Sequence, residues 1–139
     1  MQIELPGFNE AEVSEFVPLD PGVYQVQVSR AETTVNSKGD TQLKVVFRVV
    51  NGPNQQRVMP KSKTNSPVGE EIWDFFSLTE KAIFRVKQLM IATHVIEKDG
   101  QLPGNTFDMD NLLNRTATVE LYKEDYNGKP QTRVKYLFV

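Results

Sequence analysis

Cysteine is absent from this chain of 139 residues, and histidine occurs once, at His94. The lack of cysteine excludes disulfide bonds, a thiol nucleophile, a cysteine-ligated zinc site and an iron–sulfur cluster. The longest apolar runs span only a few residues, and the first residues lack the basic and apolar regions of a secretory signal. We therefore expect a protein of a reducing cytoplasm that does not enter a membrane.

Motifs of the common enzyme classes are also missing. The chain has no glycine-rich phosphate loop, no G-x-S-x-G elbow and no H-E-x-x-H helix. A lone histidine beside an apolar stretch is far more often structural than catalytic. The acidic pairs Glu70-Glu71 and Asp108-x-Asp110 are more typical of solvated loops or helix caps than of a metal site. We expect no catalytic residue, no metal and no cofactor, and hence not an enzyme.

Charge is distributed unevenly along the chain. Of the 16 basic and 18 acidic residues, five acidic and no basic ones fall in residues 1–21, so residues 22–139 hold 16 basic and 13 acidic residues, a net charge of +3. We expect an acidic N-terminal arm, 1–21, followed by one domain, 22–139. The arm could compete with a polyanion for the basic residues. Alternatively, its apolar residues Phe8, Phe16 and Val17 could pack on the domain.

Hydrophobic periodicity predicts five strands and one helix. Period-two alternation indicates strands over 23–31, 41–50 and 71–78, while 51–69 reads as an exposed loop with a short strand over 57–60. The sequence Ser77-Leu78-Thr79-Glu80 fits a capping box, so we expect a helix to begin there and to end near His94. Its apolar stripe comprises Ala82, Ile83, Val86, Leu89 and Met90.

The last two strands form a hairpin around Asn127-Gly128, because both residues tolerate the positive φ of a type I′ turn. A two-residue turn there makes residues 126 and 129 partners, and each further pair lies one residue farther from the turn on both strands. The predicted cross-strand pairs are Leu121–Val134 and Val119–Tyr136 on one face and Tyr122–Arg133 and Glu120–Lys135 on the other.

This element order predicts a mainly β protein. The sequence β-β-β-α-β-β is that of an OB-fold-like five-stranded Greek-key barrel with one helix between strands three and four. A mixed α+β sheet with the same elements is the alternative, since closure of a barrel leaves no mark on the sequence.

Basic and aromatic residues on the outward parity of the strands point to single-stranded nucleic acid. Such proteins combine a positive groove for phosphates with aromatic rings on which bases stack. Trp73 and Phe75 could instead belong to the core, and Tyr122 opposite Arg133 could be an ordinary surface pair. The candidate binding residues are Lys38, Lys44, Arg48, Arg57, Lys61, Lys63, Trp73, Phe75, Tyr122, Tyr126, Lys129, Arg133 and Lys135.

Four stretches of the chain resemble a bacteriophage family known as DUF669: Pro21-Gly22-Val23-Tyr24-Gln25-Val26, Ser37-Lys38-Gly39-Asp40, Leu43 to Val49, and Ile72 to Leu78. The resemblance covers most of 20–138. It implies a single-stranded DNA-binding protein of phage replication or recombination, acting in the bacterial cytoplasm with other phage proteins as partners. Such binders commonly end in an acidic tail, whereas this sequence ends Lys-Tyr-Leu-Phe-Val.

Single-stranded DNA binding without sequence preference is therefore the expected function, and homo-oligomerisation stays open. The alternatives are a phage structural or assembly protein, which would use the acidic arm to contact its neighbours, and a host-directed interaction module. An oligonucleotide titration separates the first from the other two.

Overall fold

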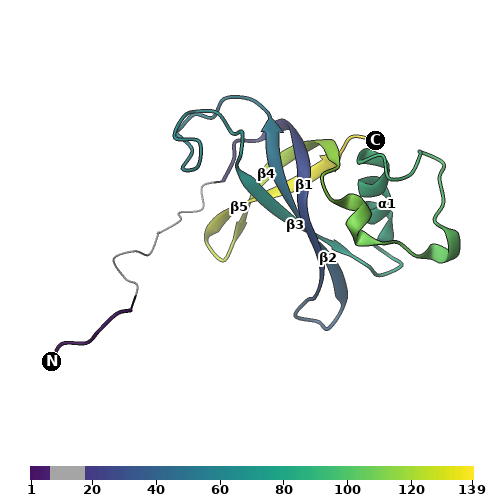
Figure 1. Ribbon diagram of the computed structural model, residues 1–139, viewed down its shortest axis with the longest axis horizontal. Helices are drawn as coiled ribbons and strands as arrows, with labels where there is room; N and C mark the ends of the chain where they lie inside the picture. The colour runs from purple at the N-terminus through teal and green to yellow at the C-terminus, as the bar shows by residue number, and fades with distance from the viewer. Residues whose placement is uncertain (7–17) are drawn as a thin grey trace.

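Five antiparallel strands form one strongly curved sheet, and a single helix packs at one end of it (Figure 1). The computed structural model describes residues 1–6 and 18–139. Its elements are β1 (Gly22–Val35), β2 (Thr41–Asn51), β3 (Glu71–Ser77), α1 (Ile83–Ala92), the 3₁₀ turns η1 (Pro103–Asn105) and η2 (Met109–Leu112), β4 (Thr116–Tyr126) and β5 (Lys129–Leu137). In these residues no helix is long and apolar enough to cross a membrane.

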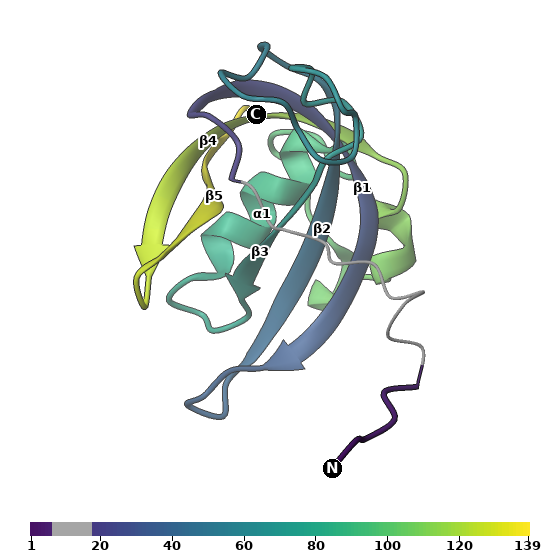
Figure 2. The ribbon, with the colours of Figure 1, turned by 90° about the vertical axis from the view of Figure 1, so that its left-hand side faces the viewer.

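The strand order is β3-β2-β1-β4-β5, so β1 lies at the centre and pairs with both β2 and β4. Figure 2 shows the long, curved β1 and β2 on one side and the β4–β5 hairpin on the other, with α1 seen between them. The prediction of a mainly β protein with one helix between the third and fourth strands is confirmed. The inner face of the curved sheet holds the core, which includes Tyr24, Phe47 and Phe76.

The two edge strands, β3 and β5, are joined by side chains, and the sheet itself stays open. The backbone N–H of Val134 in β5 donates to Oδ2 of Asp74 in β3 at 2.9 Å. Arg85 of α1 donates to the carbonyl of Val134 at 3.2 Å. The continuous backbone ladder of the predicted barrel is thus not observed between the described residues of β3 and β5.

A bulge in β1 changes which side chains face outward. Tyr24, Val26 and Val28 are buried, as their alternation predicts. The register with β2 then shifts between Val28 and Arg30, so that Arg30 lies opposite Val46. Because one residue is inserted, the parity reverses beyond the bulge and Arg30 is exposed instead of buried.

The β4–β5 hairpin has the predicted turn but only half of the predicted register. Asn127 and Gly128 have φ values of 52° and 77°, as a type I′ turn requires. The pairs Leu121–Val134 and Tyr122–Arg133 are confirmed, whereas Val119–Tyr136 and Glu120–Lys135 are wrong as cross-strand pairs. A bulge at Lys135 places Val119 opposite Leu137, which puts buried Leu137 in the core and leaves Tyr136 exposed.

Helix α1 begins at Ile83, later than the predicted capping box. Ser77 is the last residue of β3, and its hydroxyl accepts from the N–H of Thr79 at 3.4 Å, so it shapes the turn before the helix. Of the predicted apolar stripe, Val86, Leu89 and Met90 are buried. Ile83 is 44% exposed, so the predicted stripe is not buried at the start of α1.

The end of α1 near His94 is confirmed. His94 has a φ of 62°, and the amides of His94 and Val95 donate to the carbonyls of Ile91 and Met90 at 3.0 and 2.9 Å. This pair of bonds is the Schellman motif, which satisfies carbonyls that the last helical turn leaves without partners.

The connection between β2 and β3 is packed on the sheet in places, contrary to the prediction of an exposed loop with a short strand. Gln55 and Met59 are buried, and residues 57–60 form no strand. Gln55 accepts from the N–H of Asp20 at 2.7 Å and donates to the hydroxyl of Tyr24 at 2.8 Å. Leu19 is buried as well, so packing against the sheet begins before β1.

Candidate nucleic-acid interface

The outer face of β2 and β3 carries two aromatic rings with a cation between them. Ile72, Asp74 and Phe76 face the core, which leaves Trp73 and Phe75 on the opposite face, both half-buried. Lys44 in β2 lies directly opposite Phe75, and its Nζ is 5.9 Å from the centre of the Trp73 ring. The two rings are therefore surface groups on the outer face, not core residues.

A second cation lies beside Phe75, on the neighbouring edge strand β5. The guanidinium carbon of Arg133 is 5.9 Å from the centre of the Phe75 ring. Arg133 lies opposite Tyr122 on β4, on the face turned away from buried Leu121 and Val134. We call the connected set of Lys44, Trp73, Phe75, Tyr122 and Arg133 the aromatic–cation strip.

Burial alters the ionisation of Tyr122 within the strip. It raises the pKa of the Tyr122 hydroxyl above its ordinary value, and the carboxylates of Glu124 and Asp74 raise it further. Arg133 and Arg85 act in the opposite direction. The Tyr122 hydroxyl is thus neutral at neutral pH, so Tyr122 adds no negative charge that would repel a phosphate.

A second group of cations surrounds one carboxylate at the start of β3. Lys61 donates to Oε1 of Glu71 at 2.6 Å, which holds the pKa of Glu71 below its ordinary value, and the charges of Arg30 and Arg48 add to the effect. Arg48 lies opposite Glu71 in the sheet and donates to Gln27 at 2.9 Å. We call Arg30, Arg48 and Lys61 the basic cluster.

Ion pairs hold two of the predicted binding residues on the β4–β5 hairpin. Nε of Arg133 is 3.6 Å from Glu124, and Nζ of Lys135 is 3.4 Å from Glu120. Glu120 and Lys135 thus form an ion pair although the bulge places Glu120 opposite Tyr136 and not opposite Lys135. A phosphate that bound either cation would have to replace a carboxylate.

Other predicted residues lie apart from the strip. Lys38 is exposed in the turn between β1 and β2, and Lys129 is exposed next to the β4–β5 turn. Arg57 and Lys63 are exposed in the β2–β3 connection, where Arg57 contacts the carbonyl of Pro18 at 3.5 Å. The side chain of Tyr126 lies outside the described part of the structure, as do the arm residues Phe8, Phe16 and Val17.

Arg30 is the residue that reasoning from the sequence missed. Strict alternation from Tyr24 and Val26 assigns Arg30 to the buried face. The available signal was the chemistry of the residue itself, since an unpaired arginine is almost never fully buried and a charged residue at a core position suggests a bulge.

No group of three His, Asp or Glu side chains gathers closely enough to hold a metal ion in residues 1–6 and 18–139. The fold and its outer face instead define a small, mainly β protein with half-buried aromatic rings interleaved with cations on its outer face. A family model described as a protein of unknown function, DUF669, matches residues 7–136. The chain therefore belongs to the DUF669 family, and no curated protein matches it.

Proposed function

We propose that this protein binds single-stranded DNA without sequence preference along the aromatic–cation strip. The observation that carries the proposal is the alternation of rings and cations on one face, in the order Trp73–Lys44–Phe75–Arg133–Tyr122. Lys44 lies 5.9 Å from the centre of the Trp73 ring, and Arg133 lies 5.9 Å from the centre of the Phe75 ring. Every base has a flat aromatic face, so stacking tolerates any sequence and contributes roughly 1–3 kcal/mol per base.

The spacing of the rings suits an extended strand. Trp73 and Phe75 are two residues apart in β3, which separates alternate side chains by about 6.6 Å. Lys44 lies beside both rings and can meet a phosphate between two stacked bases. Tyr122 offers a third ring beyond Arg133, so a strand that crosses from β3 to β5 would meet ring and cation in turn.

The basic cluster extends this surface along β3. Glu71 is the carboxylate among three cations, and Lys61 is its direct partner. Glu70 lies here too, since its Oε1 accepts from the backbone N–H of Lys61 at 3.0 Å, so three cations stand beside two carboxylates and the balance stays positive, which attracts a polyanion.

The architecture supports the same function. We propose that the curved sheet is a partly open OB-fold-like barrel in which Asp74 and Arg85 bridge the gap between the edge strands. OB-folds bind oligonucleotides on strands two and three, between the loops that join strands one to two and four to five. Here those strands carry Lys44, Trp73 and Phe75, and the two loops are flanked by Lys38 and Lys129. Phage replication or recombination in a bacterial host is the setting that the resemblance to phage proteins implies.

Tryptophan fluorescence tests the proposal, because Trp73 is the only tryptophan. Titration with oligothymidine should quench the emission to saturation. The variant Trp73→Ala, followed by anisotropy of a labelled oligothymidine, should weaken binding by about 1–3 kcal/mol. Phe84→Ala is the matched control: Phe84 is an exposed aromatic on α1, and its loss should leave the affinity unchanged. Unchanged emission and equal affinities for the three proteins would refute the proposal.

A further inference from the structure

The bulge in β5 leaves a pair of aromatic rings on the surface at the end of the sheet. Lys135 and Tyr136 are both exposed, and Leu137 after them is buried. Phe138, one residue past the end of β5, is exposed again. The ring centres of Tyr136 and Phe138 are 5.1 Å apart, with an angle of 79° between the ring planes. In this edge-to-face arrangement each ring keeps at least one face that its partner does not cover.

The ring pair continues the row of outward side chains that belongs to the aromatic–cation strip. Tyr122 and Glu120 share the outer face of β4, because Leu121 between them is buried. Their partners on β5 are Arg133 and Tyr136. Tyr136 therefore occupies the next outward position of the sheet after Arg133.

The spacing of the two rings repeats that of the strip. Phe138 follows Tyr136 by two residues, and its N–H donates to the carbonyl of Thr118 in β4 at 3.0 Å, so pairing with β4 continues to this point. Two residues of extended chain span about 6.6 Å, the same step as that between the two rings of β3. A DNA strand that leaves the strip along β5 would thus meet two further rings.

The charges beside the ring pair balance each other. Nζ of Lys135 is 3.4 Å from Glu120, which lies opposite Tyr136 on one side and opposite Val23 of β1 on the other. Val23 is 49% exposed and Tyr136 50%, so apolar surface flanks the ion pair. A ligand at this end of the sheet would therefore be held by contact with apolar and aromatic surface more than by charge.

We propose that Tyr136 and Phe138 form a second base-stacking subsite for the DNA strand that the aromatic–cation strip holds. The inference rests on the proposed function, since the strip supplies the phosphate contacts that the balanced charges beside the ring pair do not. Short oligonucleotides bind to the strip, and only longer ones reach the ring pair. The contribution of the pair should depend on the length of the DNA and not on salt, because stacking beside balanced charges releases no counterions.

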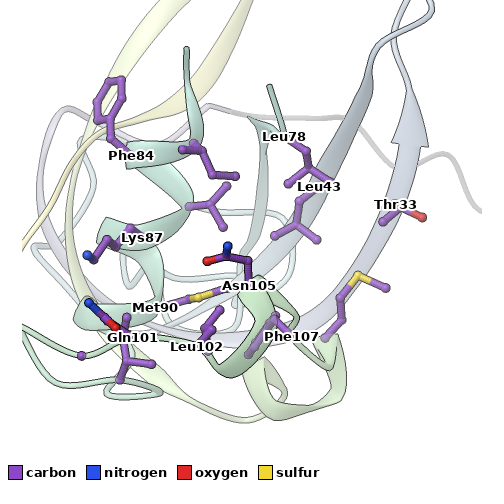
Figure 3. A pocket seen from close by; sticks show the side chains of 15 residues that line it. Thr33, Leu43, Leu78, Phe84, Lys87, Met90, Gln101, Leu102, Asn105 and Phe107 are labelled. Carbon is purple, nitrogen blue, oxygen red and sulfur yellow. The ribbon is translucent and has the colours of Figure 1, made fainter. Parts of the chain in front are cut away.

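A control ring is available on another surface. Phe84 of α1 is 59% exposed and borders an apolar cleft of about 910 Å³. Figure 3 shows this cleft, which is lined from three parts of the chain: α1, residues 96–109, and the adjoining strands with Thr33 of β1 and Leu43 of β2. Because Phe84 belongs to α1 and not to the β4–β5 hairpin, Phe84→Ala removes an exposed ring without changing the proposed subsite.

The test is a length series of labelled oligothymidines of about 4 to 16 nucleotides, the range of site sizes found for OB-folds, followed by anisotropy. We expect Tyr136→Ala and Phe138→Ala to weaken binding of the longest oligothymidine about ten-fold and of the shortest less than two-fold, with an unchanged salt slope. Tyr136→Phe keeps the ring and should bind every length like the wild type. Trp73→Ala should weaken binding at all lengths, and Phe84→Ala at none.

Folding and self-association are measured on the same variants. Both rings are exposed, so the melting temperatures of the alanine variants should match that of the wild type. Equal losses of affinity at every length, or no loss at any length, would overturn the second subsite, while quenching of Trp73 by DNA would leave the proposed function standing. So would a lower mean mass of the alanine variants in light scattering without DNA, combined with unchanged DNA affinity, since the rings would then join copies of the chain. Failure of the wild type to bind any oligothymidine would refute both proposals.

Discussion

If the protein binds single-stranded DNA as proposed, Lys44 has a place in both phosphate contact and base stacking. Its ammonium lies 5.9 Å from the Trp73 ring and on the strand position opposite Phe75. A cation over one ring and beside the next can neutralise a phosphate next to a stacked base. Arg133 occupies the equivalent position on the other side of Phe75. The energetic role of each cation should therefore appear in the salt dependence of binding.

Removal of a phosphate-contacting cation should make the salt dependence of oligothymidine binding less steep. Each neutralised phosphate of a single strand contributes a slope of about −0.7 to the log–log plot. We expect Lys44→Ala, Arg48→Ala and Arg133→Ala each to reduce the slope by roughly this amount. Lys98→Ala, at an exposed lysine outside the strip, serves as the control. Three slopes equal to that of the wild type would place the phosphates elsewhere.

His94 has a backbone role at the end of α1: its N–H completes the helix terminus, and its carbonyl accepts from Nη1 of Arg115 at 3.2 Å. The Schellman motif requires positive φ at this position, and the observed φ is 62°. A residue with a Cβ is disfavoured in this conformation, whereas glycine has no such penalty. The only histidine of the chain thus ends a helix, and its side chain is exposed.

Replacement of His94 by glycine should stabilise the protein. Removal of the unfavourable left-handed conformation should contribute about 1 kcal/mol, equivalent to a rise in melting temperature of about 3 °C. His94→Ala keeps a Cβ and should not show this gain. Thermal unfolding followed by circular dichroism measures both variants, and a gain shared equally by alanine and glycine would contradict the explanation.

The β4–β5 hairpin carries basic side chains on its surface together with carboxylates that pair with them. Its twist and its turn place Tyr122 and Arg133 opposite each other, but Glu124 sits 3.6 Å from the same guanidinium. Glu120 and Lys135 repeat this arrangement farther along the hairpin. Solvent reaches at least one member of each pair and screens the interaction, so these pairs contribute little to stability. Their larger effect is to reduce the positive charge that the hairpin offers to a ligand.

Release of Arg133 from its carboxylate should strengthen binding of oligothymidine. We expect Glu124→Gln to raise the affinity about two- to three-fold at low salt, with the gain lost as salt screens the charges. Asp125→Asn removes a neighbouring negative charge for which no ion pair with Arg133 is found, so it controls for net charge. Equal gains for the two variants would show that the ion pair itself has no role.

At the scale of the whole molecule, Asp74 links the two edges of the sheet. It is buried, and it accepts from the N–H groups of Val134 and Phe75 at 2.9 and 2.7 Å. Burial raises the pKa of this carboxyl above its ordinary value, although these two hydrogen bonds and the charges of Arg85 and Arg133 lower it. The curved sheet is thus held together at its edges by a group whose charged form is costly.

This balance predicts a pH-dependent effect on stability. Because the pKa of Asp74 is higher in the folded state than in the unfolded state, protonation favours folding, and its contribution is lost as pH rises through the folded pKa. Asp74→Asn cannot lose a proton. The melting temperature of the variant minus that of the wild type should therefore increase from pH 4 to pH 7. A constant difference across this range would contradict the raised pKa.

Glu71→Gln provides a control of opposite sign. The pKa of Glu71 is lowered by Lys61, so its contribution to stability is present above the unfolded pKa and is lost as pH falls. The melting temperature of this variant minus that of the wild type should therefore decrease over the same rise in pH.

The sequence alone determined the local features of this protein. Alternation places Leu43, Val45 and Phe47 in the core, and the Asn127-Gly128 turn sets the first cross-strand pairs of the hairpin, because both depend on neighbours close in the chain. The outward parity of Trp73 and Phe75 follows from the same period of two.

Only the tertiary structure decided the features that depend on distant contacts. The bulges that expose Arg30 and bury Leu137 are set by pairing with the neighbouring strands, and period-two alternation does not mark them; only the arginine at a core position gave a signal for the first. The Asp74–Val134 hydrogen bond joins residues 60 positions apart, and the cleft beside α1 is formed by three separate parts of the chain. Alternation along one strand reports which face is buried; it carries no information on which other segment covers that face or leaves it open.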